Sequence, residues 1–129
     1  MTLADTSAWV EYLRRTESLV DRRLEALLER GELAVTDPVM LEVLAGALDE
    51  PHARKLRRML GRCELVSTSG PTDYEQAALI YRTCRLGGNT VRALTDCLIA
   101  AVAIRCDLPI LHADSGFEAL ARHTALTLA

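Results

Sequence analysis

Short apolar runs alternate along the chain with longer segments in which apolar residues recur at helical spacing. The short runs, residues 2–4, 33–36, 64–67, 108–112 and 126–128, predict strands. The longer segments, residues 7–14, 19–30, 37–48, 52–62, 72–86, 95–106 and 115–122, predict helices. This alternation indicates an α/β fold in which a parallel sheet of about five strands is flanked by helices on both faces.

Length and composition are consistent with one domain covering residues 1–129. Half of the 129 residues are hydrophobic, enough for a core that buries roughly two-thirds of the unfolded surface. The longest apolar run, residues 97–104, is far shorter than the roughly 20 residues that a membrane-spanning helix needs. The segment from Met1 to Asp5 has no basic region and reaches an acid at once, unlike a signal peptide. We therefore expect a cytoplasmic protein.

The spacing of the cysteines and histidines does not predict a zinc site or another site for a soft metal ion. Cys63, Cys84, Cys97 and Cys106 have no C-x-x-C spacing and are interpreted as buried thiols in a reducing compartment. The three histidines are scattered singly, without the helical i, i+4 pairing typical of zinc ligands. Any metal ion is therefore expected to have oxygen ligands.

Four carboxylates lie at predicted strand ends or helix starts. They are Asp5, Glu42, Asp96 and Asp114. In a parallel sheet with crossover helices, the carboxyl ends of strands and the amino ends of helices share one edge, where ligands bind. We therefore expect the four acids, which come from distant parts of the chain, to lie at that edge.

Three of the four acids also have an ordinary explanation. Glu42 could be a polar surface position, Asp96 could interact with its helix dipole, and Asp114 could cap the last helix. The expected caps leave the acids free, because Ser7, Thr95 and a Ser115-x-x-Glu118 capping box could serve instead. Asp37 is expected to cap the third predicted helix and Pro38 to take its first position, with Leu41, Leu44, Ala45 and Leu48 as its core stripe.

Four neighbouring carboxylates repel one another unless a cation relieves the repulsion. Mg²⁺ and Mn²⁺ prefer oxygen ligands, bridge to phosphates and can generate a hydroxide nucleophile. The sequence has no Gly-rich phosphate loop and no Ser-His-Asp ordering. Metal-dependent phosphodiester hydrolysis is therefore the function that uses all four acids.

The basic residues suggest a nucleic-acid partner despite the net charge of −3. Of the 15 basic residues, 14 are arginine, and Arg54, Arg57 and Arg58 share one face of a predicted helix. Arg92 is a further candidate for RNA contact. A solvated helix face in an arginine-rich chain is the alternative.

Four motifs together resemble the PIN-domain ribonucleases, and among them the VapC-type toxins of toxin–antitoxin pairs. They are Asp5-Thr-Ser-Ala-Trp-Val-Glu-Tyr-Leu, Pro38-Val-Met-Leu-Glu42, and Asp96-Cys-Leu-Ile-Ala-Ala followed by His112-Ala-Asp114-Ser-Gly-Phe117. The resemblance implies a PIN fold and a Mg²⁺- or Mn²⁺-dependent endoribonuclease acting on structured RNA such as tRNA or rRNA. It also implies a homodimer and a cognate antitoxin. Asp5, Glu42, Asp96 and Asp114 would be the catalytic, metal-binding acids, with Thr6, Ser7 and Thr95 as supporting polar residues.

The chain departs from the family pattern at Gly116, where many relatives have a further acid. This puts a second metal ion in doubt. One alternative is a PIN-like fold that is catalytically silent and only binds RNA or protein, which the complete acid quartet disfavours. Another is a phosphoacceptor receiver domain, disfavoured because Thr6 stands where a second acid would be needed and the only lysine is Lys55. The high apolar content also predicts an exposed apolar groove for a partner or dimer.

Overall fold

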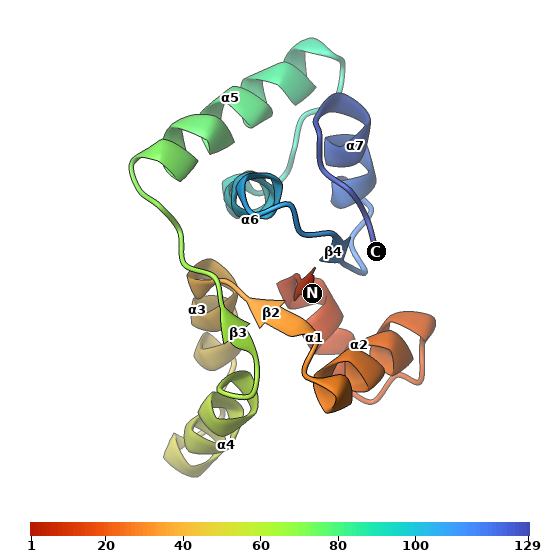
Figure 1. Ribbon diagram of the computed structural model, residues 1–129, viewed down its shortest axis with the longest axis vertical. Helices are drawn as coiled ribbons and strands as arrows, with labels where there is room; N and C mark the ends of the chain where they lie inside the picture. Colours follow the sequence, from red (N-terminus) through yellow and green to blue (C-terminus); the bar gives the residue numbers. More distant parts are fainter.

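The computed structural model describes residues 1–129 and contains four short strands and seven helices (Figure 1). In chain order these are β1 (Thr2–Ala4), α1 (Thr6–Leu13), α2 (Leu19–Arg30), β2 (Leu33–Val35), α3 (Asp37–Ala45), α4 (Glu50–Leu60), β3 (Glu64–Leu65), α5 (Thr72–Leu86), α6 (Leu94–Arg105), β4 (Ile110–Leu111) and α7 (Gly116–His123). Helices α2 and α5 have the predicted bounds, and the other helix ends differ from the prediction by no more than three residues.

The strands form one sheet in the order β3-β2-β1-β4, and every neighbouring pair is parallel. The predicted parallel α/β fold is confirmed. The predicted fifth strand is reduced to an isolated parallel bridge between Ile110 and Leu128. Two backbone hydrogen bonds form this bridge, from the amide of Ile110 to the carbonyl of Thr127 and from the amide of Ala129 to the carbonyl of Ile110.

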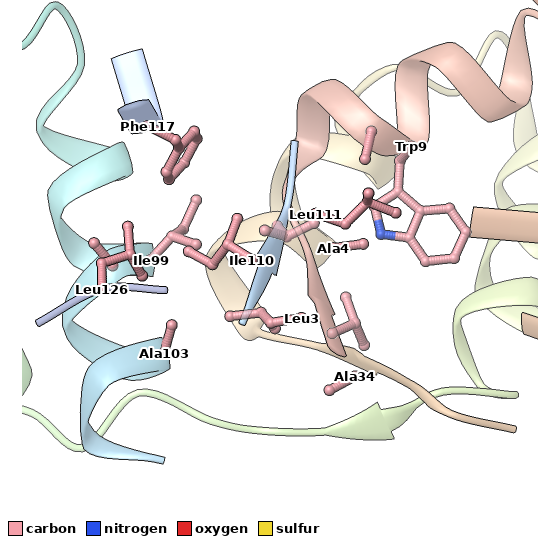
Figure 2. Close-up of a cluster of buried hydrophobic side chains, with 14 of the residues drawn as sticks. Leu3, Ala4, Trp9, Ala34, Ile99, Ala103, Ile110, Leu111, Phe117 and Leu126 are labelled. Carbon is pink, nitrogen blue, oxygen red and sulfur yellow. The ribbon is translucent and has the colours of Figure 1, made fainter. Parts of the chain in front are cut away.

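Helices cover both faces of the sheet, as predicted. In the close-up of the core, Ile99 and Ala103 of α6 and Phe117 of α7 lie on one side of the strands, and Trp9 of α1 lies on the other (Figure 2). All four side chains are fully buried. At roughly 25 cal/mol per Å² of apolar surface, burying large side chains such as Trp9 and Phe117 is a main source of stability. No helix is both long enough and apolar enough to cross a lipid bilayer.

Helix α3 is rotated relative to the predicted core stripe, which is wrong at three of its four positions. Val39 and Val43 are the buried residues, whereas Leu41 and Leu48 have exposed fractions of 70% and 87%, Ala45 is exposed and only Leu44 packs partly against the core. The physical reason is that almost every residue around Glu42 is apolar, so the sequence does not define which side faces the sheet. The rotation places leucines on the surface beside the acid.

Candidate functional site

The strand order places the switch point of the sheet between β1 and β4, where a crevice is expected. The chain adds β2 and β3 successively on one side of β1 and then returns to add β4 on the other side. Ligands of parallel α/β sheets bind at such a switch point, outside the carboxyl ends of the strands. Asp5 directly follows β1, and Asp114 lies three residues after β4. Two of the four predicted acids therefore come from the two strands that border the crevice.

Asp5 is held by the first turn of α1. Its side chain is only 4% exposed, and its Oδ2 atom accepts hydrogen bonds from the amide of Ser7 at 2.9 Å and from Ser7 Oγ at 2.6 Å. Asp5 is thus the N-cap of α1, and the prediction that Ser7 caps this helix is wrong. The strand ends with Asp5 in extended geometry, which directs its carboxylate back over the free amides of the helix.

Ser7 also connects Asp5 with the loop that carries Asp114. While Ser7 Oγ donates to Asp5, it accepts a 2.9 Å hydrogen bond from the amide of Ala113. One hydroxyl group therefore joins the ends of β1 and β4 across the crevice. The sequence could not predict the contact of the Ala113 amide, because any residue except proline offers the same backbone donor.

Glu42 comes to the site from α3. It lies in the second turn of this helix and is exposed, and its Oε1 atom accepts a 3.1 Å hydrogen bond from Thr6 Oγ1. The start of α3 is fixed in turn by Asp37, whose carboxylate accepts hydrogen bonds from the amide and the hydroxyl of Thr68, both at 3.0 Å. Asp37 was expected as the cap, but it is the first residue of the helix and Thr36 is the N-cap.

Asp114 is exposed and supports the start of α7. Its Oδ1 atom accepts a 2.9 Å hydrogen bond from the amide of Gly116, where the helix begins. Ser115 has helical geometry and makes no capping hydrogen bond, so the predicted capping box is wrong. A Cβ atom on Gly116 would lie 3.3 Å from Asp114 Oδ1 and 3.9 Å from Asp96 Oδ2. The departure at Gly116 therefore lies between two of the acids.

Asp96 lies in the first turn of α6, the helix with the largest number of buried residues. Burial, and after it the nearby charges of Asp5, Asp114 and Glu42, together raise the pKa of its carboxyl group to about 7. All four acids are thus close enough to interact. Thr95 was expected to cap α6, but the helix begins one residue earlier, with Ala93 as the N-cap and no side-chain cap. Thr95 is half-buried in the first turn.

No basic side chain is paired with any of the four acids. The two salt bridges of the chain, Arg30–Glu32 and Arg105–Asp73, lie elsewhere. With the side chains as they stand, no three His, Cys, Asp or Glu residues are close enough to form a complete ligand set for a metal ion. Mg²⁺ fits such an open cluster because it keeps several of its waters and is held directly by one or two carboxylates. The oxygen donors and the uncompensated charge fit this ion.

The remaining predicted residues lie away from the cluster or on the surface. Arg54, Arg57 and Arg58 are exposed on α4, and Arg92 is exposed just before α6. The four cysteines form no disulfide; Cys84 and Cys97 are buried, while Cys63 and Cys106 are half-buried rather than buried as predicted.

The sequence interpretation missed an ion pair outside the site, between a buried aspartate and an exposed arginine. Asp73 is 1% exposed and is bound by Arg105 through Nε and by the amide of Ser69. It joins the start of α5 to the end of α6. Nothing in the sequence distinguishes these two residues from surface charges.

The fold and the site define a known class of protein. The family model described as PIN domain matches residues 2–123. The chain therefore belongs to the PIN-domain family.

The chain is also similar to individual proteins of known sequence or structure. The chain is 42% identical to Ribonuclease VapC11 of Mycobacterium tuberculosis and to VapC ribonuclease Mb1587 of Mycobacterium bovis, over 100% of this chain and 98% of each relative. Among solved structures, its fold is similar to VapBC2 from Rickettsia felis bound to a promoter DNA fragment, with a TM-score of 0.75, 17% identity, and 99% and 96% of the two chains covered. FitAcB from Neisseria gonorrhoeae gives a TM-score of 0.75 at 22% identity with the same coverage.

Proposed function

We propose that this protein is the toxin of a toxin–antitoxin pair and a Mg²⁺- or Mn²⁺-dependent endoribonuclease that hydrolyses phosphodiester bonds in structured RNA, such as tRNA or rRNA. One observation supports the proposal: Asp5, Glu42 and Asp114 lie close enough to Asp96 for their charges to raise its pKa, and no basic side chain is paired with any of the four acids. The names of the relatives support ribonuclease activity.

The four acids would hold the metal ion directly or through its bound waters, and their supporting residues would keep them in place. When bound, Mg²⁺ or Mn²⁺ would supply a nucleophilic hydroxide and neutralise charge that develops on the phosphate. Ser7 keeps the Asp5 carboxylate fixed against α1, and Thr6 keeps that of Glu42 directed toward the crevice. Without a metal ion, the raised pKa lets the Asp96 carboxyl hold a proton near neutral pH, which lowers the repulsion within the cluster.

Cleavage by the purified protein tests the proposal. We expect it to cut mixed tRNA or rRNA in Mg²⁺ or Mn²⁺ and not in excess chelator. Asp96→Asn should abolish cleavage, and the matched control Glu118→Gln should not, because Glu118 is an exposed acid with no side-chain hydrogen bond. Mapping new 5′ ends in total RNA after brief expression of wild type and Asp96→Asn would identify the cut bond. Cleavage that persists in chelator or in Asp96→Asn would refute the mechanism.

A catalytically silent, RNA- or protein-binding PIN domain is the second candidate. It would bind RNA without producing new ends, so the same cleavage assay separates it from a nuclease. The complete set of four acids supports the nuclease, because a protein that only binds RNA gains nothing from an uncompensated cluster of negative charge.

We further propose a homodimer and an antitoxin as protein partners. The similar solved structures include a toxin–antitoxin complex from Klebsiella pneumoniae, with a TM-score of 0.71 at 21% identity. Leu41, Leu48 and Leu94 give the surface exposed apolar side chains that such contacts need. Light scattering of the purified chain measures its oligomeric state, and a monodisperse monomer at high concentration would count against the dimer.

A further inference from the structure

One face of α4 is basic from Arg54 to the end of the helix. Arg54, Lys55, Arg57 and Arg58 are exposed there, and the exposed Arg62 follows one residue after the C-cap. At 100° per residue these five side chains cover an arc of about 160°, and Leu56, Met59, Leu60 and Cys63 fill the opposite side. Leu56 and Leu60 are buried, so the packing of α4 fixes which side faces the solvent. We call the five basic residues the α4 basic face.

The α4 basic face has no partner within the protein. Neither of the two salt bridges includes any of its residues, and none of the five side chains donates a hydrogen bond. Residues 49–62 contain five basic and two acidic side chains, a net charge of +3, which leaves −6 for the rest of the chain. Positive charge is thus concentrated on one helix of an otherwise acidic molecule.

The position of α4 suits an RNA that is bound at the acid cluster. Helix α4 packs against α3, the helix that carries Glu42, and extends from it at one end of the molecule, far from α5 and α7 (Figure 1). The carboxylate cluster repels phosphate, so affinity for RNA has to come from another surface. Because α4 is about 16 Å long, it can contact several phosphates. Four of the five basic residues are arginines, whose planar guanidinium groups bind phosphate through paired hydrogen bonds.

We propose that the α4 basic face binds the sugar-phosphate backbone of the RNA substrate outside the bond that is cleaved. The inference rests on the proposed ribonuclease function, because it names the surface that positions RNA for that site. Phosphate contacts of this kind carry no sequence information but fix the register of the RNA on the protein.

Binding of mixed tRNA to the full chain tests this inference. The measurement uses the Asp96→Asn protein in chelator, so that no RNA is cut. The test variant carries Arg54→Gln, Arg57→Gln and Arg58→Gln, and the matched control carries Arg23→Gln, Arg82→Gln and Arg122→Gln, three exposed arginines on other helices. Both variants lose the same charge, and melting curves check that both are folded. Gln keeps the helix propensity at each position.

We expect only the test variant to lose specific phosphate contacts. With about 0.9 counterions released per phosphate of a duplex, three lost contacts reduce the slope of log affinity against log salt by about 2.7, and the affinity at 0.15 M salt by roughly 150-fold. Equal losses in test and control would mean that only net charge matters, and would overturn the inference. It would also be overturned if the test variant kept its RNA affinity but lost a co-expressed antitoxin.

The inference and the ribonuclease proposal fail in different ways. If wild type binds tRNA through α4 but never cleaves it in Mg²⁺ or Mn²⁺, the nuclease proposal is wrong and the binding face stands. If wild type cleaves RNA and the α4 variant cleaves it with an unchanged KM and salt dependence, the nuclease proposal stands and the α4 basic face has no role in it.

Discussion

Replacing Asp96 with asparagine should stabilise the metal-free protein at alkaline pH while it abolishes activity. Burial and the charges of Asp5, Asp114 and Glu42 raise the pKa of Asp96 from 3.8 to about 7. A carboxyl group whose pKa is higher in the folded than in the unfolded protein stabilises the fold below pH 3.8. This contribution is lost as the pH rises through 7. Asparagine has nearly the same shape as aspartate and carries no charge at any pH. The Asp96→Asn variant therefore does not lose this stabilisation as the pH rises.

The size of the effect follows from the two pKa values. At pH 8, ionising Asp96 in the folded state rather than the unfolded state costs up to about 4 kcal/mol, at 1.36 kcal/mol for each pKa unit. Because Asp96 is partly exposed, water screens the repulsion, and we discount the difference to about 2 kcal/mol. For a domain of this size, that corresponds to a melting temperature about 8 °C higher in the variant.

Thermal melting in chelator from pH 4 to pH 8 measures the difference. Wild type and Asp96→Asn should melt together near pH 4 and diverge as the pH rises, whereas Glu118→Gln should follow wild type throughout. Adding Mn²⁺ at 100 times its dissociation constant should stabilise wild type by about 2.7 kcal/mol and the variant by less. If Asp96→Asn melts below wild type at pH 8 in chelator, or if the difference does not depend on pH, the four carboxylates do not repel one another as the structure indicates.

Three further substitutions test the surroundings of the acids and the missed ion pair. Ser7→Ala should weaken Mn²⁺ binding in calorimetry and reduce cleavage about tenfold, because the loops after β1 and β4 lose the hydroxyl group that joins them. Ser7→Thr keeps a hydroxyl group and should retain Mn²⁺ binding and cleavage better than Ser7→Ala does. Gly116→Asp should strengthen Mn²⁺ binding relative to the control Gly116→Ala, because it adds a carboxylate beside Asp114 and Asp96; equal binding would contradict this. Arg105→Met should lower the unfolding free energy by about 3 kcal/mol in urea titrations, because it leaves the buried Asp73 without its charged partner.

The alternation of strands and helices could be predicted because each segment has a clear period and a clear stop. Helix α2 has the predicted bounds: Ser18 accepts the amide of Asp21 at its start, and Gly31 ends it in left-handed geometry. Both signals are local, so the sequence contains them. The edge of the sheet where the acids lie could be predicted for the same reason, since the direction of parallel strands fixes it.

The errors arise where tertiary contacts decide between similar local options. Asp5, and not Ser7, caps α1, because β1 has to end before the crevice and leaves Asp5 in extended geometry. Helix α3 has too few polar residues to define its buried side, and contact with the sheet selects Val39 and Val43. The pairing of Asp73 with Arg105 joins residues 32 positions apart, a distance over which the sequence gives no signal.

The three consecutive residues Asp5, Thr6 and Ser7 connect most of the acid site. Asp5 is one of the acids, Thr6 binds Glu42, and Ser7 binds both Asp5 and the amide of Ala113 before Asp114. All three lie at the start of α1. This one turn of helix therefore holds the ends of β1 and β4 and the helix α3 in position, although the carboxylates that they carry repel one another. Asp96 has no such hydrogen bond and is partly buried in the first turn of α6, so burial first, and then the charges of the other three acids, raise its pKa. Conservative changes at Thr6 or Ser7 should therefore impair metal binding before they impair folding.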